Sequence, residues 1–275
     1  MFIYDKLELA TEVKKCYEHN GKIYAILNNT VFYPESGGQN SDVGTIGTAN
    51  VLSVFKYEED ILHEIDGVVS GDVYCKVNET VRYNNSLLHT AQHLFSAIFE
   101  MSGYDTTSFS MKGNYFTIDI VEKLNRLELD KFENKINDCI RKGNRVEGRY
   151  YNHEIDTDIN ISNTLYEVDK IRLVIIENIE KNICGGTHVE NISEIKYLKI
   201  IKFKYSGNKT RVDVMIGSDA INYINNSYNI YYDIVKLINQ NDVDTYSYIE
   251  SKLKENKKIG KKLQKLEKSL LNDKK

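Results

Sequence analysis

The segment Ser86-Leu87-Leu88-His89-Thr90-Ala91-Gln92-His93-Leu94-Phe95-Ser96-Ala97-Ile98-Phe99 contains no Gly or Pro and is apolar along one side. This pattern predicts a helix with a buried face. His89 and His93 stand four residues apart, so a helix would present both imidazoles on one face, about one turn apart. Two such imidazoles can share a metal ion, although histidine pairs at this spacing also occur in cores and on surfaces.

A second motif further along the chain adds two more metal donors. In Cys184-Gly185-Gly186-Thr187-His188, a thiol and an imidazole are again separated by three residues. Imidazole nitrogen and thiolate sulfur are ligands that zinc prefers. We therefore predict a Zn²⁺ site formed by His89, His93, Cys184 and His188.

Length and composition bound the class of protein. The chain has 275 residues, of which 41% are hydrophobic and 28% charged, as is ordinary for a globular protein of two domains or of one domain with an appendage. No apolar run approaches the roughly 18 residues of a membrane helix, and residues 1–6 lack the features of a signal peptide. The cysteines show no disulfide framework. We expect a cytoplasmic protein with no membrane partner.

The chain divides by pattern into three parts. Residues 1–82 contain short apolar runs between turn residues, which predicts a small N-terminal β-barrel. Residues 83–217 mix helical and strand patterns, which predicts an α/β two-layer sandwich that carries the zinc site. Residues 218–275 are helical in pattern, so we predict a C-terminal helical arm. The fold class is α+β.

Within residues 83–217, the periodicity predicts a helix over 129–142 that ends at Gly143. Residues 152–166 are polar and are expected to be irregular or partly helical. The remaining expected elements are strands, over 115–120, 145–151, 171–176, 195–205 and 211–216, and the strand 171–176 delivers the chain to the CGGTH turn.

The helical arm carries a weak heptad repeat and a basic charge. Apolar residues and Asn256 recur every seven positions, which indicates a short coiled-coil seam, and we expect pairing into a homodimer. Residues 249–275 hold ten lysines and four acidic residues, although the whole chain has a net charge of −4. A lysine run is typical of a solvated helix face, and contact with an RNA backbone is the alternative. The pattern still runs at residue 275, so a longer chain is also compatible with it.

A loop inside the expected barrel contains the only proline of the chain. It reads Thr30-Val31-Phe32-Tyr33-Pro34-Glu35-Ser36-Gly37-Gly38-Gln39. A Pro followed by two glycines is typical of a loop with unusual backbone dihedrals. Close approach of backbone N–H groups to a ligand is the functional alternative, and the motif alone leaves both open.

Three motifs in this order and spacing, FYPESGGQ at 32–39, HTAQH at 89–93 and CGGTH at 184–188, resemble the editing domain of alanyl-tRNA synthetase and its free-standing AlaX relatives. The resemblance runs from about residue 29 to residue 217. No segment upstream resembles the aminoacylation domain, which favours a free-standing, AlaX-type trans-editing protein. The arm resembles the connector that precedes the C-terminal domain in long forms.

The resemblance implies an ATP-independent aminoacyl-tRNA deacylase whose partner is mischarged tRNA(Ala). It would hydrolyse seryl-tRNA(Ala), and in some cases glycyl-tRNA(Ala), with the help of zinc. By resemblance, the hydroxyl of Thr30 would bond the seryl side chain, which serine satisfies and alanine does not. We assign Gly37, Gly38 and Gln39 as catalytic, because their backbone N–H groups and the amide could bind the ester carbonyl or the terminal ribose.

Alternatives remain at this stage. Four protein ligands would close a tetrahedral zinc site, as in structural sites, so an RNA-binding protein with a structural zinc and no hydrolase activity is one alternative. For catalysis, a donor such as His188 would have to leave the metal when substrate binds, or the metal would have to expand its coordination. Otherwise the metal would position the substrate without activating a water. A zinc hydrolase of small esters is another alternative, but it would not need a basic arm. The Gly-Gly-Gln triplet also occurs in peptide-release factors, whose pattern the rest of the chain does not follow.

Overall fold

The computed structural model describes residues 3, 6–151, 171–238 and 245–272. The chain forms two compact units, residues 1–221 and 222–275. The domain boundaries that the sequence predicts at residues 82 and 217 stay predictions. Across the described ranges, none of the helices combines the length and the apolar character needed to cross a membrane.

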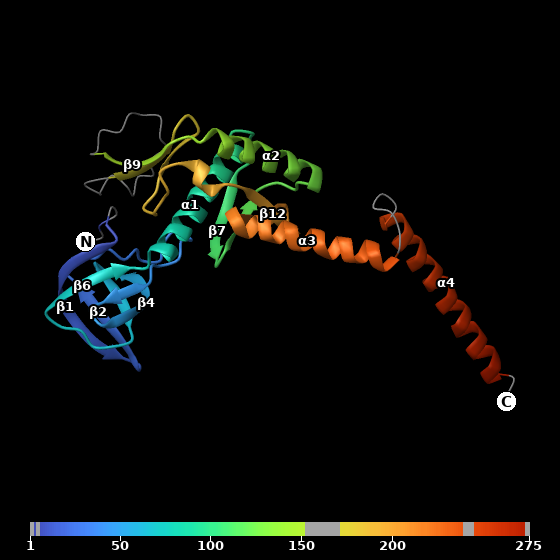
Figure 1. The fold of residues 1–275 in the computed structure, drawn as a ribbon, viewed down its shortest axis with the longest axis horizontal. Coiled ribbons are helices and arrows are strands. Elements are labelled where there is room, and N and C mark those ends of the chain that lie inside the picture. Colours follow the sequence, from blue (N-terminus) through green and yellow to red (C-terminus); the bar gives the residue numbers. More distant parts are fainter. Residues whose placement is uncertain (1–2, 4–5, 152–170, 239–244, 273–275) are drawn as a thin grey trace. The chain divides into compact units, whose positions relative to one another are not determined.

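Six strands close into a barrel near the start of the chain, which confirms the predicted N-terminal β-barrel (Figure 1). Their order is β1-β2-β5-β4-β3-β6, and neighbouring strands are antiparallel. Small and branched side chains such as Ala25, Val51 and Val54 fill the interior. The strands are β1 (Glu8–His19), β2 (Lys22–Leu27), β3 (Gly44–Ile46), β4 (Ala49–Tyr57), β5 (Asp60–Ile65) and β6 (Asp72–Val77).

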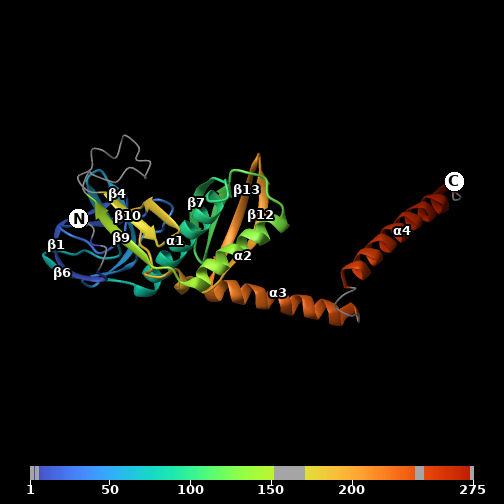
Figure 2. The same ribbon diagram turned by 90° about the horizontal axis from the view of Figure 1, so that it is seen from above.

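The predicted sandwich consists of two helices packed on a four-stranded antiparallel sheet. The helices α1 (Glu79–Glu100) and α2 (Arg126–Lys142) share one apolar core with this sheet. Figure 2 shows two of its strands, β12 and β13, side by side. The sheet has the order β12-β13-β8-β7, with β7 (Thr106–Lys112), β8 (Tyr115–Ile120), β12 (Leu198–Ser206) and β13 (Lys209–Ile216).

Local capping explains where the two helices begin and end. The side chain of Asn78 accepts a hydrogen bond from the N–H of Val81 and caps α1. Asn125 and Glu128 form a reciprocal capping box at the start of α2. Gly143 ends α2 in the left-handed conformation, with φ 74°. The predicted helix therefore ends where expected and begins three residues earlier, at Arg126.

A second, three-stranded sheet carries the chain into the CGGTH turn. Its order is β11-β10-β9, with β9 (Val146–Tyr151), β10 (Ile171–Ile176) and β11 (Glu180–Ile183). The predicted strand 171–176 is present as β10, and the short strand β11 lies between it and the turn. A 3-10 helix, Ile192–Ile195, occupies the start of the predicted strand 195–205. The expectation for residues 152–166 lies outside the described residues.

The C-terminal part is helical in its described residues, as predicted. It contains α3 (Gly217–Ile238), which begins in the first compact unit, and α4 (Thr245–Asn272). Apolar side chains on α4, including Leu263, Leu266 and Leu270, are exposed. Pairing through this arm stays a prediction.

Candidate metal centre and adjoining cavity

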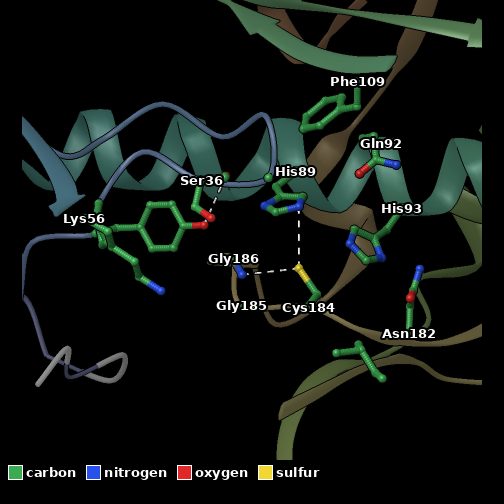
Figure 3. Close-up of a pocket in the computed structure, with 14 residues that line it drawn as sticks. Ser36, Lys56, His89, Gln92, His93, Phe109, Asn182, Cys184, Gly185 and Gly186 are labelled. Carbon is green, nitrogen blue, oxygen red and sulfur yellow. Dashed lines mark hydrogen bonds between the residues drawn. The ribbon is translucent and has the colours of Figure 1, made fainter. Parts of the chain in front are cut away.

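The helix α1 presents His89 and His93 on one face, as their spacing predicts. Both side chains are buried, and their ring centroids lie 5.2 Å apart. In Figure 3 both imidazoles project from α1 towards Cys184. The helix therefore fixes two nitrogen donors in one place before any metal binds.

The turn after β11 brings Cys184 and His188 to the same point. Arg172 on β10 holds this turn, because its guanidinium donates hydrogen bonds to the carbonyl oxygens of Cys184 (2.9 Å) and Gly186 (2.8 Å). The backbone N–H of Gly186 points at the sulfur of Cys184, at 3.2 Å. A side chain at position 186 would collide with His89, since a Cβ there would lie 2.0 Å from the Cε1 atom of His89. Only glycine permits this approach of turn and helix.

The four predicted ligands form one cluster. Their donor atoms all lie within 4.8 Å of one another. The Cys184 sulfur is 3.6 Å from Nε2 of His89 and 3.4 Å from Nε2 of His188. In a tetrahedral zinc site, bond lengths of about 2.3 Å to sulfur and about 2.0 Å to nitrogen place such atoms roughly 3.5 Å apart. The residues present therefore fit zinc.

The electrostatics of the cluster also suit a cation. Burial opposes ionisation of the Cys184 thiol, but its contacts with His188, His89 and His93 outweigh burial and bring its pKa far below the usual range. Burial lowers the pKa of His188 and keeps that imidazole neutral. Thiolate and neutral imidazole are the forms that bind a metal. His93 is the exception, because burial opposes its charge but Cys184 and Glu180 outweigh burial and raise its pKa, so a metal would have to displace a proton from this imidazole.

A cavity of about 350 Å³ adjoins the cluster (Figure 3). His89, His93 and Cys184 line it, whereas His188 lines a second cavity of about 760 Å³. The first cavity has the size of a small-molecule site. Its wall also includes Tyr33, Ser36, Gly37, Lys56, Gln92 and Phe109.

Comparison with known proteins agrees with the motifs. Residues 171–212 match the family described as threonyl and alanyl tRNA synthetase second additional domain. Over 286 residues the chain is 30% identical to alanyl-tRNA editing protein Aarsd1-A of Xenopus laevis, covering 97% of this chain and 68% of that protein. Over 209 residues it is 34% identical to alanyl-tRNA editing protein AlaX-M of Methanosarcina barkeri, covering 68% of this chain and 86% of that protein. The chain belongs to the alanyl-tRNA editing protein family.

A third relative in this editing-protein family is alanyl-tRNA editing protein AlaX-L of Pyrococcus horikoshii, at 27% identity over 248 residues, with 84% of this chain and 60% of that protein covered. The matched residues 171–212 run from the start of β10 into β13 and include the turn with Cys184 and His188. The family match therefore covers half of the donor set, and α1 supplies the other half.

In this editing-family chain, the four loop residues predicted to act on substrate lie in different surroundings. Gly37 lines the cavity. Gly38 packs on β7, where a Cβ would lie 2.6 Å from the carbonyl oxygen of Phe109. Gln39 is fully buried, and its amide contacts His89. The catalytic and substrate-binding roles assigned to these residues stay predictions.

Thr30, the fourth of these residues, lies within the barrel and is 2% exposed. Its hydroxyl lies 2.8 Å from Nε2 of His63 and accepts a hydrogen bond from the N–H of Phe32. His63 Nδ1 faces the carbonyl oxygen of Ala25 at 3.0 Å, so Nε2 is the accepting nitrogen and Thr30 is its donor. Thr30 is not among the residues that line the cavity beside the metal cluster.

Several residues of the site lie outside the three sequence motifs. Glu180 lies 2.7 Å from Nδ1 of His93. The ring of Phe109 stacks on the imidazole of His89, with centroids 5.7 Å apart. Glu180 precedes Cys184 by four residues and could have been suspected from that proximity. Phe109 and Lys56 belong to strands that no motif marks, so only the fold reveals them.

Proposed function

We propose that this chain hydrolyses the ester of tRNA(Ala) wrongly charged with serine, and that glycyl-tRNA(Ala) is a second substrate. The observation that carries the proposal is the cavity of about 350 Å³ whose wall contains three donors of one metal-binding cluster. The names of the relatives support it, because those from Xenopus laevis and Methanosarcina barkeri are alanyl-tRNA editing proteins. An aminoacyl ester is labile, so its hydrolysis needs mainly a positioned water and stabilisation of the oxyanion.

In this proposal His89, His93 and Cys184 hold zinc at the cavity, and His188 binds from the other side. When bound, zinc supplies a Lewis acid that can polarise a carbonyl or lower the pKa of a water. We propose that backbone N–H groups at Gly37 and Gly38 orient the ester carbonyl or the terminal ribose. The position of Gly37 on the cavity wall supports this role.

The cavity wall suits the 3′ end of a tRNA. Lys56 is exposed and lines the cavity, so its ammonium group can attract a phosphate. Phe109, also on this wall, offers an aromatic surface for a base, and such stacking contributes about 1–3 kcal/mol per base. We propose that the terminal nucleotide lies along these two side chains, with its ester towards the cluster.

The basic arm and its pairing belong to the same proposal. Lysines are frequent along α4, and they would contact the tRNA backbone. The exposed apolar side chains of α4 would pair with a second copy of the chain. We place this activity in the cytoplasm.

A structural zinc is the second candidate function, because four protein donors close a tetrahedral site. Hydrolysis would require either an expanded coordination or the departure of one donor. In the second candidate the chain binds RNA and hydrolyses nothing.

The test is incubation of the protein with seryl-, glycyl- and alanyl-tRNA(Ala), alongside a small seryl ester that carries no tRNA. We expect rapid loss of the seryl ester on tRNA, slower or equal loss of the glycyl ester and little loss of the alanyl ester. Hydrolysis of the small ester at the same rate would indicate a general esterase. Binding of all three tRNAs without hydrolysis would indicate the structural zinc.

A further inference from the structure

We propose that Gln39, which the barrel loop supplies, is a positioning residue that fixes the tautomer and orientation of His89 for the metal. Its Oε1 atom lies 2.7 Å from Nδ1 of His89, and its side chain is fully buried. The inference rests on the metal site in the proposed function, but not on the identity of the substrate.

Thr187 defines which end of the Gln39 amide faces His89. The backbone N–H of Thr187, which can only donate, lies 3.0 Å from Oε1 of Gln39. The Nε2 atom of Gln39 donates to the hydroxyl oxygen of Thr187 at 2.9 Å. If the amide were flipped, its NH₂ group would face the backbone N–H of Thr187, and both groups are donors. The oxygen must therefore face both Thr187 and His89.

The tautomer of His89 follows from this orientation. Because Oε1 of Gln39 can only accept, Nδ1 of His89 must carry a hydrogen. Nε2 is then free to bind a metal through its lone pair, and it is the atom 3.6 Å from the Cys184 sulfur. A partner on the outward nitrogen of a ligand histidine typically fixes the ring and raises its basicity.

The other two imidazoles have acceptors of their own. Glu180 faces Nδ1 of His93 at 2.7 Å. Thr90 faces Nδ1 of His188 at 3.1 Å, and its hydroxyl donates instead to the carbonyl oxygen of Ser86. All three histidines therefore turn Nδ1 outward to an acceptor, which leaves Nε2 for the metal.

Gln39 differs from these acceptors because it comes from the barrel. Its loop is held on the sandwich by the N–H of Met111, which donates to the carbonyl oxygen of Gly38 at 3.1 Å. Gly186 packs against the contact between Gln39 and His89, since a Cβ at position 186 would lie 2.9 Å from Oε1 of Gln39. Docking of the barrel loop and affinity for the metal are therefore linked.

The test compares zinc affinity in Gln39→Asn, Gln39→Leu and Gln39→Glu, measured by competition with a chromophoric chelator. Asn is too short to reach His89 and Leu has no acceptor, so we expect both to weaken zinc binding about 10- to 100-fold. Glu keeps the acceptor and should bind zinc at least as tightly as the parent protein. Gln92→Leu is the matched control, because Gln92 also lines the cavity but bonds Ser96, and we expect unchanged zinc affinity.

The histidine tautomers supply a second readout that loss of packing would not move. In long-range ¹H–¹⁵N spectra of the zinc-free protein, neutral His89 should carry its hydrogen on Nδ1 in the parent and in Gln39→Glu, and the two tautomers should mix in Gln39→Asn. Parent-like zinc affinity and tautomer in Gln39→Asn would overturn the proposal. A parent protein that binds zinc but hydrolyses no aminoacyl-tRNA would contradict the proposed function and leave this inference standing.

Discussion

Gly186 approaches His89 so closely that a Cβ at position 186 would lie 2.0 Å from Cε1 and 2.2 Å from Nδ1 of the imidazole. The turn and α1 can meet only where one residue has no side chain. The contact explains how a turn after β11 delivers Cys184 and His188 to a face of α1.

Replacement of Gly186 by Ala should displace His89 from the cluster. We expect zinc affinity to fall by about 10- to 100-fold and deacylation to fall with it. Gly260→Ala is the control, because Gly260, like Gly186, lies outside the positive-φ region, and its added Cβ has nothing within 4 Å. Titration with a chromophoric chelator measures both variants, and unchanged zinc affinity in Gly186→Ala would show that the turn can shift freely.

Thr30→Val tests the proposed contact with the seryl hydroxyl. The substitution removes the donor to His63 and the acceptor of the Phe32 N–H, so stability should fall by about 1–3 kcal/mol. If Thr30 also selects substrate, the ratio of seryl to alanyl ester hydrolysis should fall, while Thr30→Ser should keep it. A lower stability with an unchanged ratio would assign Thr30 to the barrel alone.

His63 should make stability depend on pH. Burial lowers its pKa to about 4 from 6.5, so between these values the unfolded chain binds a proton that the folded chain does not. Stability is therefore highest above pH 6.5 and falls towards pH 4, by about 2 kcal/mol between pH 7.5 and pH 5. Urea unfolding at both pH values measures the free energy of unfolding. Between pH 7.5 and pH 5 it should fall by about 2 kcal/mol more in the parent than in His63→Gln. Equal losses in the two proteins would contradict a neutral, buried His63.

Lys196 should be a site where glycine stabilises the chain. Its backbone adopts φ 64° and ψ −58°, and the N–H of Tyr197 bonds the carbonyl oxygen of Ile195 at 2.7 Å. This tight turn is strained for a residue with a Cβ, at a cost of about 1–3 kcal/mol. Lys196→Gly should raise the free energy of unfolding by about 1 kcal/mol after the entropy of glycine is subtracted. Lys196→Ala is the control, because it keeps the backbone strain and also removes the lysine charge. An equal rise in the free energy of unfolding in both variants would show that loss of the charge, not relief of strain, stabilises the chain.

The sequence predicted the metal cluster because both halves of it are local patterns. Residues four apart lie on one face of any α-helix, which holds for His89 and His93, and the glycines of the turn permit close approach to that face. The barrel was predictable for a similar reason, since turn residues such as Gly21 and Gly67 separate its short strands.

Strands in which apolar and polar residues do not alternate regularly were harder to predict. In β1 the register of pairing with β2 shifts between Val13 and Lys15, so the two-residue apolar pattern breaks in the middle of the strand. The hairpin strand β11 has only four residues, with Glu180, Lys181 and Asn182 among them, and it reads as a polar loop.

The directions of the loop side chains could not be predicted either. Both glycines of the loop have positive φ, 59° at Gly37 and 82° at Gly38, so consecutive residues turn to different surroundings. Gly37 meets the cavity, and Gln39 meets His89. Gln92, between the two histidines of α1, bonds Ser96 while lining the cavity.

The most direct test of the account is zinc titration of chelator-treated protein while hydrolysis of seryl-tRNA(Ala) is followed. We predict no hydrolysis above the buffer rate without zinc, and a rise to a plateau at one zinc per chain. His93→Ala should stay at the buffer rate at the same zinc concentrations. Full hydrolysis in the zinc-free protein, or none in the zinc-loaded protein, would contradict the account.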